Sequence, residues 1–105
     1  MPFDREDDFA AEMKAGAAEA AALMKTLSNP SRLMIICLLV EGEKSVAELA
    51  RALGDKQPSV SQHLARLRAE GLVVPRRAGR MIFYALNDNR VRPILEALHA
   101  AYCPR

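Results

Sequence analysis

The stretch from Lys56 to Gly71 carries polar side chains at a spacing suited to contacting a nucleic acid. Val60, Leu64 and Leu67 fall at i, i+4 and i+7, so they share one stripe of a helix with 3.6 residues per turn. We expect this stripe to be buried. The opposite face carries hydrogen-bonding groups separated only by small alanines, and these groups are Ser59, Ser61, Gln62 and Arg66.

Local signals limit this helix at both ends. Pro58 fixes φ in the first turn, and Gly71 can adopt the left-handed conformation that follows a last turn. A helix of about 13 residues, roughly 20 Å long, results. Such a helix fits the major groove of DNA. A plain amphipathic surface helix would carry the same stripe, and this alternative stays open.

Cys37 and Cys103 are the only cysteines, and they are the other candidates for chemistry. The chain has no Cys-x-x-Cys motif and no Ser/His/Asp pattern that would support a catalytic nucleophile. We therefore do not expect the protein to be an enzyme. A protonated His99, one turn before Cys103, would favour the reactive thiolate. The alternative is a pair of buried, reduced thiols, which is ordinary in a cytosolic chain.

The composition fits a single cytoplasmic domain. The 105 residues are 50% hydrophobic and include no Trp, which favours a mostly α fold with an aliphatic core. No apolar run approaches the roughly 20 residues that span a bilayer, and the start, MPFDREDDF, is acidic where a signal peptide is basic. We therefore expect no membrane contact.

Charge is distributed unevenly along the chain. Residues 1–24 carry two basic and six acidic groups, a net charge of −4. Residues 56–80 carry six basic groups and one acidic group, a net charge of +5. A basic concentration that coincides with a polar-faced helix is what a polyanion-binding surface requires, although solvated charge would give the same count.

Three helices are expected before position 56. Residues 9–24 are nearly all strong helix formers with alanine on several sides, and this surface suggests contact with a second subunit rather than packing within one domain. Asn29 as N-cap and Pro30 at N1 begin a second helix that Gly42 ends. Ser45 to Glu48 has the spacing of a capping box and begins a third. A short third helix and the 56–71 helix make a helix-turn-helix.

After Gly71 the hydrophobic period changes from 3.6 to 2. Leu72–Arg76 and Arg80–Leu86 are separated by Arg77-Ala78-Gly79, so they predict a β-hairpin with glycine where φ is positive. Three arginines at its tip, Arg76, Arg77 and Arg80, would meet phosphate or a minor groove, and a solvated tip is the alternative. The face expected toward the core comprises Ile82, Tyr84 and Leu86.

A final helix follows the hairpin. Residues 87–89 are expected to cap it, Pro93 falls in its first turn, and Pro104 ends it. Its apolar stripe comprises Val91, Ile94, Leu95, Leu98 and Tyr102.

These elements make a winged helix, and the sequence resembles the ArsR/SmtB family of bacterial repressors over roughly residues 25–86. The matching stretches are LSNPSRL (27–33), QPSVSQHL (57–64), LRAEGLV (67–73) and RAGR (77–80) followed by Tyr84. The resemblance implies one winged-helix domain over residues 1–105 and a homodimer joined by residues 9–24 and 90–103. It also implies binding to an inverted repeat in double-stranded DNA and release by an inducer.

The family's metal-sensing patterns are incomplete here. A Cys-x-Cys signature would lie on the third helix, but residues 45–53 contain no cysteine. A zinc pattern on the last helix needs several His and carboxylate ligands, and only Glu96 and His99 are present. We therefore expect neither a cofactor nor a bound metal.

The two cysteines resemble those of the family's sulfide-responsive dithiol branch, one on the second helix and one at the end of the last. This resemblance implies that persulfide, polysulfide or oxidants bridge Cys37 and Cys103 and release DNA. A metal-responsive repressor, and a redox-insensitive regulator or anti-repressor of the same fold, remain as alternatives.

The predicted DNA contacts divide into base-reading and phosphate-holding groups. Gln62 and Ser59 are expected to read bases because they share the exposed face and Gln pairs well with adenine. His63 lies near the core edge and is expected to be structural or phosphate-directed. The full predicted set is Gln57, Ser59, Ser61, Gln62, His63, Arg66, Arg76, Arg77 and Arg80.

Overall fold

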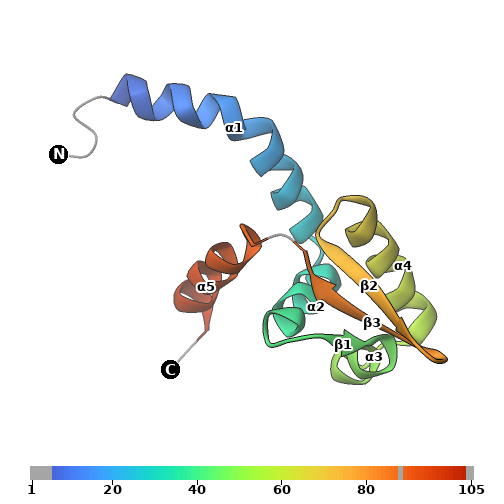
Figure 1. The fold of residues 1–105 in the computed structure, drawn as a ribbon. Coiled ribbons are helices and arrows are strands. Elements are labelled where there is room, and N and C mark those ends of the chain that lie inside the picture. Colours follow the sequence, from blue (N-terminus) through green and yellow to red (C-terminus); the bar gives the residue numbers. More distant parts are fainter. Residues whose placement is uncertain (1–5, 88, 104–105) are drawn as a thin grey trace.

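The computed structural model describes residues 6–87 and 89–103, with side chains from Asp8 onward. The expected end of the last helix at Pro104, and any part of Asp88 in its cap, lie outside these residues. In chain order the elements are α1 (Glu6–Leu27), α2 (Pro30–Val40), β1 (Lys44–Ser45), α3 (Val46–Leu53), α4 (Gln57–Ala69), β2 (Val73–Ala78), β3 (Met81–Leu86) and α5 (Val91–Tyr102). This order confirms the predicted winged helix, mainly α with a β-hairpin wing (Figure 1).

The expected capping signals are confirmed in α2 and α3. The Asn29 side chain accepts a hydrogen bond of 3.0 Å from the Arg32 backbone N–H. Ser45 and Glu48 form the reciprocal capping box, in which the Ser45 N–H donates to Glu48 Oε1 over 2.8 Å and the Glu48 N–H donates to Ser45 Oγ over 3.1 Å. Both helices therefore begin where their local sequence predicts.

The sheet contains one strand more than the predicted hairpin. Its order is β1-β3-β2, and the two-residue β1 pairs with β3 through Lys44 opposite Tyr84. The predicted connection Arg77-Ala78-Gly79 is wrong because Arg77 pairs with Ile82, and the ladder continues to the end of β2. The turn is shorter and centres on Gly79, whose φ of 61° fits the expected positive φ.

The core lies between the helix-turn-helix and the sheet. It receives buried side chains from α2, α3, α4, the start of β2 and α5, and the fully buried ones include Ile35, Ile36, Leu49, Val60, Leu64, Leu67 and Val91. Tyr84 and Leu86 pack against this cluster from β3 as predicted, whereas Ile82 does not join it.

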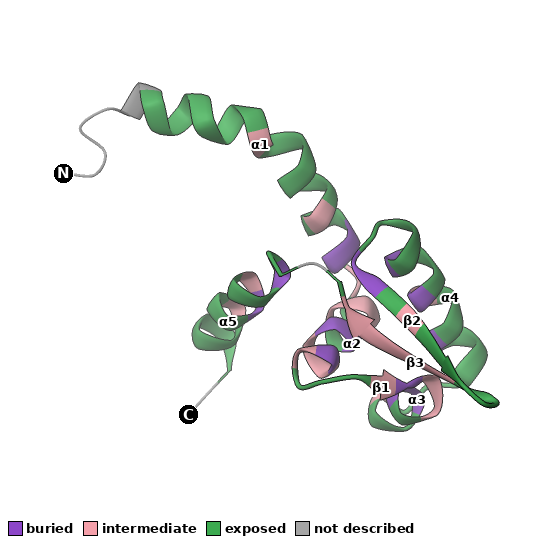
Figure 2. Cartoon of the chain, in the orientation of Figure 1, coloured by how far each residue is buried: buried purple, intermediate pink, exposed green. Residues whose placement is uncertain are grey.

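The long helix α1 projects away from this body. It is longer than the predicted 9–24, and its residues from Asp8 to Lys25 are exposed except for Gly16 and Leu23 (Figure 2). The Cα radius of gyration is 16.1 Å, compared with about 13 Å for a compact chain of this length. Helix α1 therefore extends well beyond what the core can cover.

Helix α5 lies on the same side as α1, away from the wing tip (Figure 1). Its predicted cap is wrong. The N-cap is Arg90, whose side chain does not cap the helix, and Asn87 instead donates through Nδ2 to the Gly71 carbonyl over 3.3 Å. Val91 and Leu95 are buried as expected, but Tyr102 is 79% exposed.

Among the described residues, no single helix is long and apolar enough to cross a membrane, and only α1 and α2 taken together, as a pair bent by 101°, pass that test.

Candidate nucleic-acid interface and cysteine pair

Helix α4 separates its buried and exposed faces as its sequence predicts. It spans 13 residues, and Val60, Leu64 and Leu67 are fully buried against the core. The side chains expected to contact DNA from this helix are exposed, except His63, which is half-buried at the core edge; the exposed ones are Gln57, Ser59, Ser61, Gln62 and Arg66. The helix therefore presents a polar surface with hydrogen-bonding groups free of the core.

A groove joins the start of α4 to the wing. It encloses about 280 Å³ and is lined on one side by Gln57 and Ser61 and on the other by Arg80 and Met81. Residues 45–47, at the start of α3, close it. The structure thus brings three predicted DNA contacts, Gln57, Ser61 and Arg80, around one concave surface.

The three wing arginines are not equivalent. Arg80 lies in the turn and Arg77 near the end of β2, and within the described part of the chain neither has an ion-pair partner. Arg76 lies further from the turn, opposite Phe83, and its guanidinium carbon is 5.0 Å from the centroid of that ring. The expectation that all three arginines occupy the tip is therefore wrong for Arg76.

Arg76 is also held by an acidic partner from the loop before β1. Its Nη2 and Nε donate to the two carboxylate oxygens of Glu43 over 2.7 and 2.9 Å. These side-chain hydrogen bonds hold the pKa of Glu43 below its usual value. A bidentate pair of this kind fixes the direction of the guanidinium.

Arg66 also has a carboxylate partner. Its Nε donates to Glu70 Oε2 over 2.9 Å, one turn along α4. The other oxygen of Glu70 accepts a hydrogen bond from the hydroxyl of Thr26 at the end of α1. The hydrogen bond from Thr26 lowers the pKa of Glu70 most, and the hydrogen bond from Arg66 lowers it further. The Glu70 carboxylate is therefore ionised at neutral pH.

Cys37 and Cys103 come from different elements and differ in exposure. Cys37 is half-buried on α2, packed against the core, while Cys103 is exposed at the C-cap of α5. Burial raises the pKa of the Cys37 thiol, and the charge of Cys103 raises it further. Cys103 therefore affects the pKa of Cys37 although 66 residues separate the two in sequence.

Sequence reasoning missed two residues that matter to this surface, Glu43 and Thr26. Both act on a predicted DNA-contacting arginine, Glu43 directly and Thr26 through Glu70. No spacing pattern could have found them, because their partners lie 33 and 44 residues away. Within the described residues, no three His, Cys, Asp or Glu side chains gather as a metal site would require.

Comparison with known proteins gives one consistent relationship. Residues 29–74 match the family described as "Bacterial regulatory protein, arsR family". The "Biofilm growth-associated repressor" of Xylella fastidiosa is 46% identical over 92 residues, which cover 88% of this chain and 81% of that protein. The "Transcriptional activator HlyU" of Vibrio cholerae is 42% identical over 92 residues, covering 88% of this chain and 85% of that protein.

Solved structures of similar proteins support the same family relationship. The crystal structure of the transcriptional repressor BigR from Xylella fastidiosa superposes with a TM-score of 0.87 at 44% identity, covering 91% of this chain and 98% of that one. A homodimeric winged helix-turn-helix DNA-binding domain from Mycobacterium bovis superposes with a TM-score of 0.71 at 30% identity, covering 85% of this chain and 82% of that one. The chain belongs to the ArsR/SmtB family of winged-helix bacterial regulatory proteins, in the branch that contains BigR and HlyU.

Proposed function

We propose that this protein is a transcriptional repressor that binds an inverted-repeat operator as a homodimer. We propose further that it is released when reactive sulfur species or oxidants bridge Cys37 and Cys103. The observation that carries the DNA-binding proposal is the groove that gathers Gln57, Ser61 and Arg80 between α4 and the wing. Two similar proteins carry the word repressor in their names, which supports repression rather than activation.

The exposed helix α1 supports the homodimer. Its described part offers apolar side chains to solvent, among them Phe9, Met13 and Met24, each close to half exposed. Helix α5, which lies on the same side of the molecule as α1, carries the exposed Tyr102 (Figure 1). Large apolar side chains exposed together along one helix are typical of a subunit interface. An inverted repeat requires two such chains, with recognition helices about one DNA turn, roughly 34–36 Å, apart.

The exposure of the cysteines supports an order for the sulfur reaction. The exposed Cys103 thiolate attacks a polysulfide and forms a bond to the second sulfur from its end. The sulfur–sulfur bond on the far side breaks, so Cys103 gains two sulfur atoms and a shorter polysulfide leaves. The Cys37 thiolate then attacks the inner of the two added sulfurs, and the outer one leaves as hydrosulfide. The product is a trisulfide between Cys37 and Cys103. The two thiols have lost two electrons, which the hydrosulfide carries away.

Such a bridge would couple two parts of the fold that serve different purposes. Cys37 lies on α2, which packs beneath the helix-turn-helix, and Cys103 ends α5, which lies beside the surface proposed for the dimer. Joining them restrains α5 relative to the DNA-binding body. We expect this restraint to change the spacing of the two recognition helices and thereby lower operator affinity.

The decisive experiment combines intact mass with DNA binding. An operator is first selected from random duplexes with the reduced protein. The protein is then treated separately with polysulfide, hydrogen peroxide and zinc, and each sample is weighed and titrated against that operator. An internal bridge between the cysteines that accompanies loss of affinity, after polysulfide or after peroxide, supports the proposal. Release by zinc without a mass change in the cysteines would favour a metal-responsive repressor instead.

A second candidate is a regulator that opposes another repressor, since one relative is named a transcriptional activator. A reporter gene behind the selected operator distinguishes the two. Repression by the reduced protein alone supports our proposal, while an effect that requires a second DNA-binding protein supports the alternative.

A further inference from the structure

We infer that Thr26 and Glu70 are positioning residues that set the distance between the two recognition helices of the dimer. This inference rests on the proposed function, because it concerns how a dimer matches the spacing of its half-sites. It is carried by a junction at which the proposed dimer helix α1 is hydrogen-bonded to the end of the recognition helix α4.

The junction uses both oxygens of one carboxylate. Glu70, the C-cap of α4, accepts from the Thr26 hydroxyl through Oε1 and from Arg66 Nε through Oε2. Thr26 is only 1% exposed, so its hydroxyl has little access to water. Glu70 is thus the partner that satisfies this buried donor. Hydrogen bonds to an ionised acceptor are about twice as strong as neutral ones.

The backbone of Thr26 is held from the other side. Arg32 Nε donates to the Thr26 carbonyl over 2.9 Å, and the Arg32 N–H is bonded to the N-cap Asn29. Helices α1 and α2 meet here at 101°. The last turn of α1 is therefore tied both to the start of α2 and to the end of α4.

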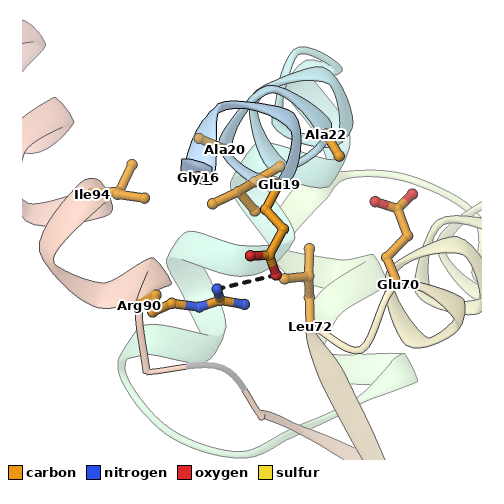
Figure 3. Close-up of a pocket in the computed structure, with 9 residues that line it drawn as sticks. Gly16, Glu19, Ala20, Ala22, Glu70, Leu72, Arg90 and Ile94 are labelled. Atoms are coloured by element: carbon orange, nitrogen blue, oxygen red, sulfur yellow. Dashed lines mark ion pairs between the residues drawn. The ribbon is translucent and has the colours of Figure 1, made fainter. Parts of the chain in front are cut away.

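Helix α1 packs against the core only near its C-terminal end, where Leu27 is buried and Leu23 is half-buried. A cavity of about 400 Å³ lies beside the junction, between α1 and the residues that face it, Leu72 and Ile94 (Figure 3). Ala20 and Ala22 border it from α1, so short side chains stand where larger ones could fill the gap. An ion pair of 3.5 Å between Glu19 and Arg90 crosses this cavity, but both side chains are more than two-thirds exposed, so the pair restrains α1 weakly. The contacts at the C-terminal end of α1 therefore contribute most to its orientation.

A small change in the angle of α1 at its C-terminal end moves its N-terminal end by a large distance. Helix α1 has 22 residues and is about 33 Å long. A rotation of about 10° at the junction displaces the far end by about 6 Å, which approaches two base-pair steps of about 3.4 Å. If α1 joins the subunits, the Thr26–Glu70 bond determines which half-site spacing the dimer fits.

The test compares affinity for DNA duplexes that differ only in spacing. The probes are the inverted repeat selected with wild-type protein, the same repeat with its spacer shortened or lengthened by one base pair, and a duplex with a single half-site. The main variant is Thr26→Val, which keeps the shape and removes the donor. The controls are Thr26→Ser, which keeps the hydroxyl, and Ser28→Ala, which removes a hydroxyl that donates to the Lys25 carbonyl over 2.6 Å within the same corner.

We expect wild type, Thr26→Ser and Ser28→Ala to prefer the selected spacing by about tenfold or more. Thr26→Val should lose most of this preference while its affinity for the single half-site stays within about twofold of wild type. If Thr26→Val does not fold, Glu70→Ala, at a partly exposed position, should show the same loss of preference. A Thr26→Val protein that keeps the full spacing preference, or that loses as much affinity for the single half-site as for the selected repeat, overturns the inference. Failure of wild type to bind any inverted repeat would instead overturn the proposed function.

Discussion

Arg76 and Glu43 face each other across the base of the wing, with two hydrogen bonds of 2.7 and 2.9 Å between guanidinium and carboxylate. The carboxylate neutralises a charge that the hairpin would otherwise offer to DNA. The same guanidinium stacks over Phe83. Arg76 therefore braces the wing, whereas Arg77 and Arg80 have no ion-pair partner among the described residues.

This difference predicts unequal salt dependence. Arg77→Gln should lower the slope of log affinity against log salt by about 0.9, as expected when one phosphate contact is lost. Arg76→Gln should lower it less, and Glu43→Gln should raise affinity because it frees the Arg76 guanidinium. Anisotropy titrations at several salt concentrations measure these slopes. The assignment fails if Arg76→Gln and Arg77→Gln lower the slope equally.

Base reading is expected from α4. Gln62→Ala should cost about 1–3 kcal/mol at one base pair of each half-site and little elsewhere, because a bidentate contact to one base is lost. Competition with operators that carry single base changes measures this pattern. Arg77→Ala is the matched control and should weaken all sequences by the same factor. A uniform loss for Gln62→Ala would remove it from the base-reading set.

Features set by neighbouring residues could be predicted from the sequence. The caps at Asn29 and Ser45 depend on groups within three positions, and the buried stripe of Val60, Leu64 and Leu67 depends on helical period alone. The two-residue strand β1 is too short to show any period. The predicted cap at residues 87–89 failed because Asn87 bonds to Gly71 instead, a partner 16 positions away.

The exposure of the predicted DNA-contacting side chains on α4 could be predicted from the sequence, but not all of their partners. The exposed face of α4 and the i,i+4 spacing of Arg66 and Glu70 follow from the sequence. The Glu43 carboxylate that holds Arg76, and the Thr26 hydroxyl that holds Glu70, reach their partners only through tertiary structure. The burial of Tyr102 could not be predicted from the sequence either. This residue continues the apolar stripe of α5, but helical period cannot say whether a neighbour covers that end, and Tyr102 is 79% exposed.

Helix α1 should be essential to the dimer. Met13 is 48% exposed, and Met13→Glu would place a carboxylate in the proposed interface, which costs several kcal/mol when the charge is unpaired. Sedimentation should change from a species near twice 11.6 kDa to the monomer. Val74→Glu, at a residue 45% exposed on β2, is the matched control and should leave the dimer intact. A Met13→Glu dimer of wild-type stability would refute this interface.

The cysteine pair gives the last prediction, and distance governs it. A direct disulfide requires Cα atoms within about 7 Å, and each inserted sulfur lengthens the bridge by up to about 2 Å. Thiols held somewhat further apart would accept a polysulfide bridge without distorting α2 or α5. A peroxide-driven disulfide would have to pull both helices together. Polysulfide should therefore release DNA at lower doses than peroxide.

Single substitutions separate a bridge from independent modification. In wild type, polysulfide should add whole sulfur atoms with loss of two hydrogens and lower operator affinity. Cys37→Ser should still gain sulfur at the exposed Cys103, since that thiol reacts without a partner, yet should stay bound to DNA. Cys103→Ser should gain sulfur slowly, because burial raises the pKa of Cys37 and reduces its thiolate, and should also stay bound. Either single variant leaving the operator after polysulfide would show that release needs no bridge, and the dithiol mechanism would have to be abandoned.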